Sequence, residues 1–448
     1  MGGGSENYAY LKSITEDSNV EEAKKVIRLM KIYRNKNRVQ QAACVALWTL
    51  GLQEKNKAKL LEYGAGQAIV ATMQFHRQDP PVLESCCAAI KNLGGNLFAL
   101  MRMGAGTEIL AAMERFPDSR RLQEHACGAI RTIATSKPNS EALIKIGVAE
   151  KIKNCMINHS DVAKVQKAAC GAVWSLCITE ENKEVLWNAG IASLVLEAMK
   201  KHPDNSRVQE YGCGAIWTFG YLYSMMRLGA SDLVLNAMKL HVDNLHVCEY
   251  GCGAIRNLAS LQVNARWLME ENATDIIFVC MGRHINDAQL QEYALLALWS
   301  IGLWEENKKD LVEVGVGPLL LGVMETHIKN PKVIETGCGV ITNLSTIEEN
   351  AYSLINNKAI VKVLKVGKLH MNNPAVQAKV MCALRNLSWW SDSHVEQLIS
   401  EGGIEFIKKS MQTHPGNSVV KTKGKETLDK LNRVKLIQKG QLNSPLKV

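Results

Sequence analysis

The sequence predicts an all-α solenoid of about ten stacked three-helix repeats, and three observations support this fold class. A methionine and a cysteine fourteen residues apart recur along nearly the whole chain with a period near 43 residues, which indicates one supersecondary unit copied many times. Seven of the ten prolines fall at one point of that period, and no segment shows the alternation typical of a strand. The pairs are Met30/Cys44, Met73/Cys87, Met113/Cys127, Met156/Cys170, Met199/Cys213, Met238/Cys252 and Met324/Cys338, with Met281/Leu295 keeping the spacing.

The longest helix of each repeat is illustrated by residues 165–176. Counted from Cys170 as position zero, small and apolar residues fall at −5, −1, 0, +2, +3 and +6, on one side of a helix. Positions −3, −2, +1, +4 and +5 fall on the other side. We therefore expect this helix to bury the cysteine column and to present the second set of positions at a surface.

The other two helices of the repeat follow in order. A polar connection at 179–182 leads to a short helix through Val185 and Trp187, which ends at Gly190, a suitable left-handed cap. A second apolar helix spans 191–199. Because three such helices cannot close a core alone, they must stack on neighbouring copies. The turn before the next long helix carries the prolines, which are Pro80, Pro81, Pro117, Pro203, Pro331, Pro374 and Pro415.

This pattern sets the expected boundaries. Residues 1–14 are interpreted as a flexible N-terminal tail and 437–448 as a basic C-terminal tail. The first repeat is expected to lack the short helix, and the short helix is expected to be clipped in 87–104 and 213–229, which would change the local superhelical twist. The repeats lie near 15–52, 53–94, 95–135, 136–178, 179–221, 222–260, 261–303, 304–346 and 347–389, with 390–436 as a polar C-terminal cap.

Composition indicates an ordinary soluble protein, with 47% hydrophobic and 22% charged residues and no apolar stretch near the ~18 residues of a membrane helix. The thirteen cysteines are interpreted as reduced core residues of a cytoplasmic protein, with cytoskeletal, ciliary and nuclear locations left open. The start Met-Gly-Gly-Gly-Ser-Glu resembles an N-myristoylation signal, but Glu6 stands where Ser or Thr is wanted. Membrane binding is therefore not expected.

Positive charge is concentrated at the C-terminal end. Residues 408–448 hold ten Lys/Arg and two acidic residues, so nearly all of the net charge of +9 lies there. A phosphate-binding track along the whole solenoid is therefore not expected, and nucleic acid is an unfavoured partner. A local patch that meets an acidic partner remains an alternative to a solvated cap helix, and it would comprise Lys421, Lys423, Lys425, Lys430, Arg433 and Lys435.

Residues 15–436 resemble the armadillo repeat family. The resemblance rests on the long helices at 209–217 and 252–258 and on asparagines at position +5 of several repeats. Other repeats have Ser or Thr at that position, namely Thr49, Thr132, Ser175, Thr218 and Ser300. The resemblance implies a right-handed α-solenoid whose third helices line a concave surface, where the asparagines hold the main chain of an extended partner. HEAT repeats, the nearest alternative, lack the short helix with its glycine. The asparagines are Asn92, Asn257, Asn343 and Asn386.

The importin-α branch of that family carries tryptophan at the position occupied here by Gly128, Gly171, Gly214, Gly253 and Gly339, so the resemblance does not extend to a nuclear-import receptor. Glycine inside a helix costs about 1 kcal/mol relative to alanine. Either these glycines allow close packing within the solenoid, or they form a flat floor for a partner main chain. The second interpretation is favoured, because position +1 points to the centre of the polar face.

Bulky side chains lie instead at positions +4 and −2. Trp, Tyr and Arg are enriched among interface hot spots. Each ring alone is explained by packing between repeats, whereas the set on one face favours a binding groove. A row of glutamates lies at −3 on the same face, at Glu84, Glu124, Glu210, Glu249, Glu292 and Glu335. The groove candidates are Trp48, Trp174, Trp217, Trp299, Arg131, Arg256, Arg385, Tyr211, Tyr250 and Tyr293, together with the four asparagines; Lys91 also stands at +4.

The sequence contains none of the common catalytic or metal-binding motifs, and its eleven histidines are interpreted as scattered residues of the connections. We therefore expect no enzymatic activity, cofactor or metal. The favoured function is a protein-interaction scaffold or adaptor that binds an extended or helical partner segment. The alternatives are a structural subunit of a cytoskeletal or ciliary assembly, and binding of nucleic acid or an acidic partner through the basic end.

Overall fold

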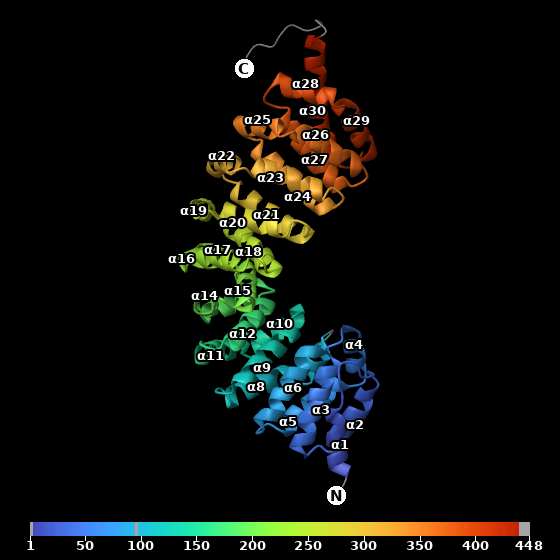
Figure 1. Ribbon diagram of the computed structural model, residues 1–448, viewed down its shortest axis with the longest axis vertical. Coiled ribbons are helices and arrows are strands. Elements are labelled where there is room, and N and C mark those ends of the chain that lie inside the picture. The colour runs from blue at the N-terminus through green and yellow to red at the C-terminus, as the bar shows by residue number, and fades with distance from the viewer. Residues whose placement is uncertain (1–2, 95–96, 439–448) are drawn as a thin grey trace. The chain divides into compact units, whose positions relative to one another are not determined.

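The computed structural model describes residues 3–94 and 97–438, and every regular element in these ranges is an α-helix (Figure 1). The predicted all-α solenoid is confirmed. The chain divides into two units: unit 1 comprises residues 1–221 and 227–233, and unit 2 comprises residues 222–226 and 234–448. In the described ranges no helix is long and apolar enough to cross a membrane.

Unit 1 begins with three helices: α1 (Gly3–Lys12), α2 (Glu22–Ile32) and α3 (Asn37–Leu50). Three-helix repeats follow. Their helices are α4 (Glu54–Glu62), α5 (Ala65–Phe75), α6 (Pro80–Leu93), α7 (Phe98–Arg102), α8 (Ala105–Arg115), α9 (Arg120–Ile133), α10 (Lys137–Lys145), α11 (Val148–Asn158), α12 (Ala163–Leu176), α13 (Glu180–Asn188), α14 (Ile191–Lys201) and α15 (Ser206–Phe219).

The residues at which the chain divides lie in α16 (Leu222–Arg227) and α17 (Ala230–Leu240). Unit 2 then continues the same helix order. Its helices are α18 (Leu245–Leu258), α19 (Gln262–Glu270), α20 (Ala273–Arg283), α21 (Ala288–Ile301), α22 (Glu305–Glu313), α23 (Val316–Thr326), α24 (Pro331–Leu344), α25 (Glu348–Asn356), α26 (Ala359–Leu369), α27 (Pro374–Leu387), α28 (Asp392–Ser400), α29 (Gly403–Thr413) and α30 (Ser418–Gln438).

A full repeat consists of helices of nine, eleven and fourteen residues, as in α13, α14 and α15. The turn between the first two uses a left-handed residue, and Gly190 there has φ 78° as predicted. Asn272 and Lys358 take the same place with φ 57° and 66°. The expected clipping is also confirmed, because α7 has five residues and α16 has six. The change of twist remains a prediction.

The N-terminal segment differs from the prediction. Residues 3–12 form helix α1, which packs against α3, so their interpretation as a tail is wrong. Leu11 is buried, and Tyr10 donates a hydrogen bond to Glu22 while the ammonium of Lys25 lies 3.5 Å from its ring centroid. These contacts anchor the segment. Within 15–52, the predicted first repeat, the only helices are α2 and α3, so this repeat lacks the short helix as expected, although the ten-residue α1 precedes it. Of the predicted basic tail, residues 439–448 lie outside the described ranges.

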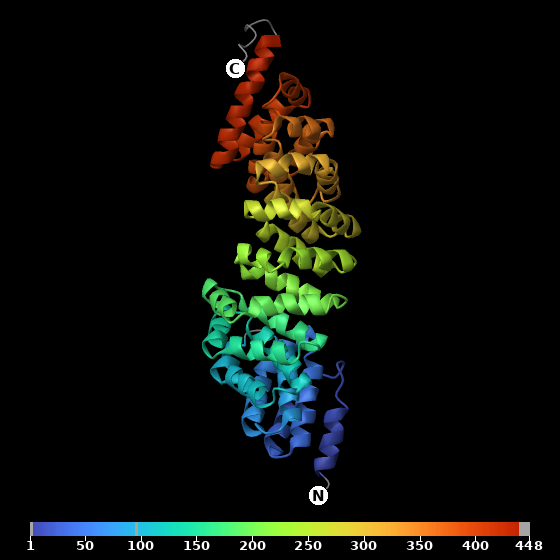
Figure 2. The same cartoon turned by 90° about the vertical axis from the view of Figure 1, so that its left-hand side faces the viewer.

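The third helices of successive repeats pack side by side and form the core of each unit. In unit 1 these are α3, α6, α9, α12 and α15; in unit 2 they are α18, α21, α24, α27 and the long last helix α30, red in Figure 2. Twelve of the thirteen cysteines are buried, and Cys382 is half-buried. Burial raises the pKa of Cys170, Cys213 and Cys338 to about 12, so these thiols are inert core groups, as predicted.

Two polar columns, which the sequence analysis did not recognise, tie the helices together. At position −4 a buried glutamine donates from Nε2 to main-chain carbonyls at the end of the second helix, as Gln209 does to Met199 at 2.9 Å and to His202 at 2.9 Å. Seven of the eleven histidines are not scattered. They recur at the repeat period, and the ring Nε2 donates to a carbonyl about one repeat earlier in His76, His159, His202, His284, His327, His370 and His414.

Candidate partner-binding surface on the third helices

We call the outward side of the third helices in each unit its third-helix wall. All fourteen predicted groove residues lie on these helices, and all are half-buried. Unit 1 holds Trp48 (α3), Asn92 (α6), Arg131 (α9), Trp174 (α12), Tyr211 and Trp217 (α15). Unit 2 holds Tyr250, Arg256 and Asn257 (α18), Tyr293 and Trp299 (α21), Asn343 (α24), Arg385 and Asn386 (α27).

The side chain at +4 of one third helix lies on the glycine at +1 of the next, an arrangement we call the glycine slot. A Cβ added to Gly214 would lie 3.0 Å from the ring of Trp174, and one on Gly339 would lie 2.4 Å from the ring of Trp299. Lys91 and Arg131 fill the slots at Gly128 and Gly171 in the same way. The expectation of a floor for a partner main chain is therefore wrong at these four glycines, because the chain's own +4 side chain takes up the space.

The asparagines at +5 link neighbouring third helices. The Nδ2 of Asn386 donates to the carbonyl of Thr342 at 2.9 Å, and Asn92 and Asn343 donate to the equivalent carbonyls of Trp48 and Trp299 at 3.3 and 3.4 Å. Thr132, one of the departures from the ladder, makes the equivalent bond through its hydroxyl. Two of these amides make a second bond within the protein, because Nδ2 of Asn343 also donates to the carbonyl of Gly302 at 2.6 Å and Oδ1 of Asn386 accepts from Arg385 at 3.1 Å.

In unit 1 the structure brings together three of the predicted groove residues. The guanidinium of Arg131 lies 4.3 Å from the ring centroid of Tyr211 and donates to its hydroxyl. The ring of Trp174 lies 6.2 Å from that of Tyr211. Tyr211 therefore joins α9, α12 and α15 into one aromatic and cationic surface.

In unit 2 cations also lie over aromatic rings, namely over Trp299 of the wall and over Trp389, which follows the end of α27. The ammonium of Lys379 lies 4.8 Å from the ring centroid of Trp299, and the guanidinium of Arg385 lies 4.1 Å from that of Trp389. Arg385 also forms an ion pair with Glu426 at 3.2 Å, so it is partly neutralised. Sequence reasoning missed Lys379 and Trp389. The sequence does point to Lys379, because it occupies position −2 of its repeat, as Tyr211, Tyr250 and Tyr293 do in theirs.

The charges of the two walls differ. Helices α6, α9 and α12 carry six cations and two carboxylates, and the ion pairs between them are long, with Lys167–Glu124 and Arg121–Glu84 both at 3.8 Å. Burial lowers the pKa of Lys91, and the cations Lys167 and Arg131 lower it further. The charged residues of this stretch are Lys91, Arg120, Arg121, Arg131, Lys164 and Lys167 with Glu84 and Glu124.

Over α18, α21 and α24 the row at −3 is acidic, with Glu249, Glu292 and Glu335. Nδ1 of His246 lies 3.0 Å from the carboxylate of Glu249. Burial raises the pKa of Tyr293, and the negative charges of Glu292 and Glu249 raise it further. These helices also carry Arg256 and Lys332, so this stretch of unit 2 has one more carboxylate than cations, whereas the stretch described above in unit 1 has an excess of cations.

The six residues of the predicted basic patch all lie on α30, but they do not act alike. Lys421, Lys425, Arg433 and Lys435 are exposed. Lys423 pairs with Glu426 at 3.0 Å, and Lys430 donates to the main-chain carbonyl of Trp389. Burial lowers the pKa of Lys430. Two of the six cations are therefore engaged within the protein.

No model of a known protein family matches the chain, and no curated protein matches its sequence. Solved structures do match. One is an engineered protein that is 16% identical, with a TM-score of 0.76, covering 93% of this chain and 99% of that chain. Another is a chain from a structure concerning the phosphorylation switch in the interaction between cadherin and β-catenin; it is 13% identical, with a TM-score of 0.56, and the match covers 95% and 99% of the two chains. At these identities the likeness shows the fold alone.

Proposed function

We propose that this chain is a non-enzymatic protein-interaction scaffold of the armadillo type, whose third-helix walls bind an extended or helical segment of a partner protein. The observation that carries the proposal is the set of half-buried Trp, Tyr and Arg side chains on helices that pack side by side. These residue types dominate binding energy at protein interfaces. The fold likeness to repeat proteins is consistent with this function.

The glycine slots support the proposal in a second way. A tryptophan ring that lies on a glycine of the next helix is held in place before a partner arrives, as Trp174 is on Gly214 and Trp299 on Gly339. Binding to a side chain that is already ordered costs less conformational entropy than binding to a mobile one. The exposed part of each ring is therefore a preorganised anchor for apolar partner side chains.

The test is affinity purification of the intact chain followed by mass spectrometry, with wall variants that keep the slots filled. We expect Lys167→Glu in unit 1 and Glu292→Lys in unit 2 each to lose partners that the unchanged protein retains, because each reverses a charge beside the aromatic residues. Matched controls are Lys200→Glu on α14 and Glu313→Lys on α22, both exposed and away from the third helices.

Helical content by circular dichroism and thermal melting should be the same in all four variants. If the wall variants keep every partner that the controls keep, the third-helix walls are not the binding surface. A stoichiometric complex that survives high salt in all variants would instead favour a permanent structural subunit. Loss of partners only on charge reversal of Lys425 and Lys435 would favour the basic end.

A further inference from the structure

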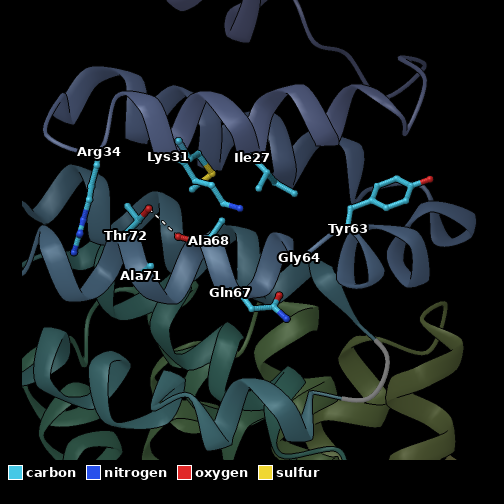
Figure 3. A pocket seen from close by; sticks show the side chains of 10 residues that line it. Ile27, Lys31, Arg34, Tyr63, Gly64, Gln67, Ala68, Ala71 and Thr72 are labelled. Atoms are coloured by element: carbon cyan, nitrogen blue, oxygen red, sulfur yellow. Dashed lines mark hydrogen bonds between the residues drawn. The ribbon is translucent and has the colours of Figure 1, made fainter.

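A cavity of about 600 Å³ lies between the second helices α2 and α5 of unit 1 (Figure 3). Its floor is apolar and made of small or buried side chains, among them Ile27, Ala68 and Ala71. Figure 3 shows Arg34 at one end of the cavity and Tyr63 at the other, with Lys31 over the space between the two helices. We call this feature the α2–α5 groove. It lies on second helices and is distinct from the third-helix walls.

The α2–α5 groove differs from other grooves between second helices in its charges. Between α8 and α11 the ammonium of Lys151 lies 2.9 Å from the carboxylate of Glu114, and between α23 and α26 Lys362 lies 3.0 Å from Glu325. An ion pair thus spans each of those grooves. Helix α5 has the sequence AGQAIVATMQF and contains no charged residue, so it offers no carboxylate to α2.

The two cations that line the α2–α5 groove, Lys31 and Arg34, accordingly form no ion pair in the described part of the chain. Within residues 3–94 and 97–438 no carboxylate lies within the 4.0 Å of an ion pair from Lys31 or Arg34. Both side chains are exposed. The guanidinium of Arg34 lies 4.5 Å from the ring centroid of Phe75, which holds it beside the groove.

The opposite end of the groove is already neutralised. Tyr63 donates its hydroxyl hydrogen to Glu21, and Glu21 also pairs with Lys24 at 2.7 Å. The groove therefore has an apolar floor, a neutral end and a cationic end. An occupant that matches it has one apolar face and carboxylates along one edge.

We propose that the α2–α5 groove is a docking site for an acidic amphipathic helix of a partner protein. The apolar face of that helix packs on Ile27, Ala68 and Ala71, and its carboxylates pair with Lys31 and Arg34. The two alanines leave room for close approach of a third helix to α2 and α5, as in other helix-in-groove complexes. The carboxylates of the docked helix would form the ion pairs with the groove cations that Glu114 and Glu325 form in the other two grooves. This site does not depend on the proposed function of the third-helix walls.

The experiment uses the full chain and a fluorescein-labelled helical peptide of about 16 residues, with leucines spaced to form one apolar stripe and glutamates elsewhere. A second peptide carries lysine in place of each glutamate. Binding is measured by fluorescence anisotropy at low salt. We expect the glutamate peptide to bind and the lysine peptide to bind at least about tenfold more weakly.

Two variants test the site. Lys31→Glu is expected to weaken binding of the glutamate peptide about tenfold, while Arg28→Glu, an equal charge change at an exposed site of α2 outside the groove, changes it less than about twofold. Ala71→Leu fills the floor and is expected to weaken binding, whereas Ala58→Leu on α4 does not. Hydrogen exchange in the complex should show added protection at α2 and α5.

Three results would each overturn the proposal. The first is equal binding of the glutamate and lysine peptides. The second is equal effects of Lys31→Glu and Arg28→Glu, which would show only long-range attraction. The third is protection on the third helices without protection at α2 and α5, which would place the peptide on a third-helix wall. A variant with altered circular dichroism is replaced by Lys31→Gln, for which the same ranking is expected.

Discussion

The third-helix walls of units 1 and 2 use the same glycine slot, and the side chains that fill it in unit 1 are Lys91, Arg131 and Trp174. In unit 1 the slot at Gly128 is filled by Lys91, a flexible cation, and in unit 2 the slot at Gly339 is filled by the rigid ring of Trp299. Each unit keeps three glutamates at −3, but in unit 1 Lys167 interrupts the row between Glu124 and Glu210. One backbone arrangement therefore supports surfaces whose charge changes from repeat to repeat.

This comparison shows that the slot is a structural feature of the repeat, whereas the side chain that fills it varies. The glycine at +1 creates a space, and any long or flat side chain at +4 can fill it, with Lys, Arg and Trp all observed. The chemistry of the wall can thus change from repeat to repeat without a change in helix packing. We expect substitutions at the slots to separate the structural role from the surface role.

The largest effect is expected for Gly339→Ala. Its new Cβ would lie 2.4 Å from the ring of Trp299, so the ring must leave the slot. Such overpacking is expected to lower the free energy of unfolding by about 1–3 kcal/mol, measured by urea denaturation and accompanied by a change in tryptophan fluorescence. Gly128→Ala should change stability by less than about 0.5 kcal/mol, because the flexible Lys91 can move and alanine favours the helix.

The control for helix propensity is Gly322→Ala in α23, where a Cβ would meet nothing within 4 Å. This variant is expected to be more stable by about 0.5–1 kcal/mol. If Gly339→Ala and Gly322→Ala had the same effect, the slot would not restrict side-chain volume, and the comparison between the units would lose its basis.

The next effect is expected for Arg131→Gln in unit 1. The guanidinium of Arg131 both stacks on the ring of Tyr211 and donates to its hydroxyl, which links helices two repeats apart. Its loss is expected to lower the free energy of unfolding by about 1 kcal/mol. Tyr211→Phe keeps the ring and removes only the hydroxyl, so about half of that loss is expected; an equal loss would assign the whole effect to the hydrogen bond.

Much of this architecture could be predicted from the sequence, because each feature recurs with the repeat. The period, the three helices, the cap at Gly190 and the clipped α7 and α16 all follow from spacing alone. What the sequence could not supply is contact between repeats. The angle of +1 on an isolated helix places Gly171 on the polar face, but Arg131 of the preceding third helix occupies that space. The sequence did not predict the α2–α5 groove, because the charge of this groove depends on the absence of carboxylates from α5.

A pH dependence of stability distinguishes the carboxylates of the two walls. In unit 1, burial raises the pKa of Glu84 above its ordinary value of 4.5, so its ionised form costs stability once the pH rises above that value. Glu84→Gln is therefore expected to be more stable than the unchanged protein at pH 7, by less than about 1 kcal/mol after solvent screening. The difference should disappear near pH 4, as measured by urea midpoints at both pH values.

The opposite sign is expected for Glu426 of unit 2. A hydrogen bond from Lys423 lowers its pKa, and the charges of Lys423 and Arg385 lower it further, so its ionised form contributes stability above the ordinary value. Glu426→Gln should be less stable than the unchanged protein at pH 7, and this loss should shrink as the pH falls. Two variants that moved in the same direction would contradict the assigned causes of these pKa shifts.

The smallest effect is expected for Lys379→Gln in unit 2. The ammonium of Lys379 lies 4.8 Å from the ring centroid of Trp299 at a half-exposed site, where a cation–π contact contributes about 0.5 kcal/mol. Because this contact lies above a slot that Trp299 already fills, its loss should leave the ring on Gly339 and the tryptophan fluorescence unchanged. A fluorescence shift as large as that of Gly339→Ala would mean that Lys379 helps to hold the ring. The aromatic wall of unit 2 would then depend on its cations, as Tyr211 in unit 1 is held by Arg131.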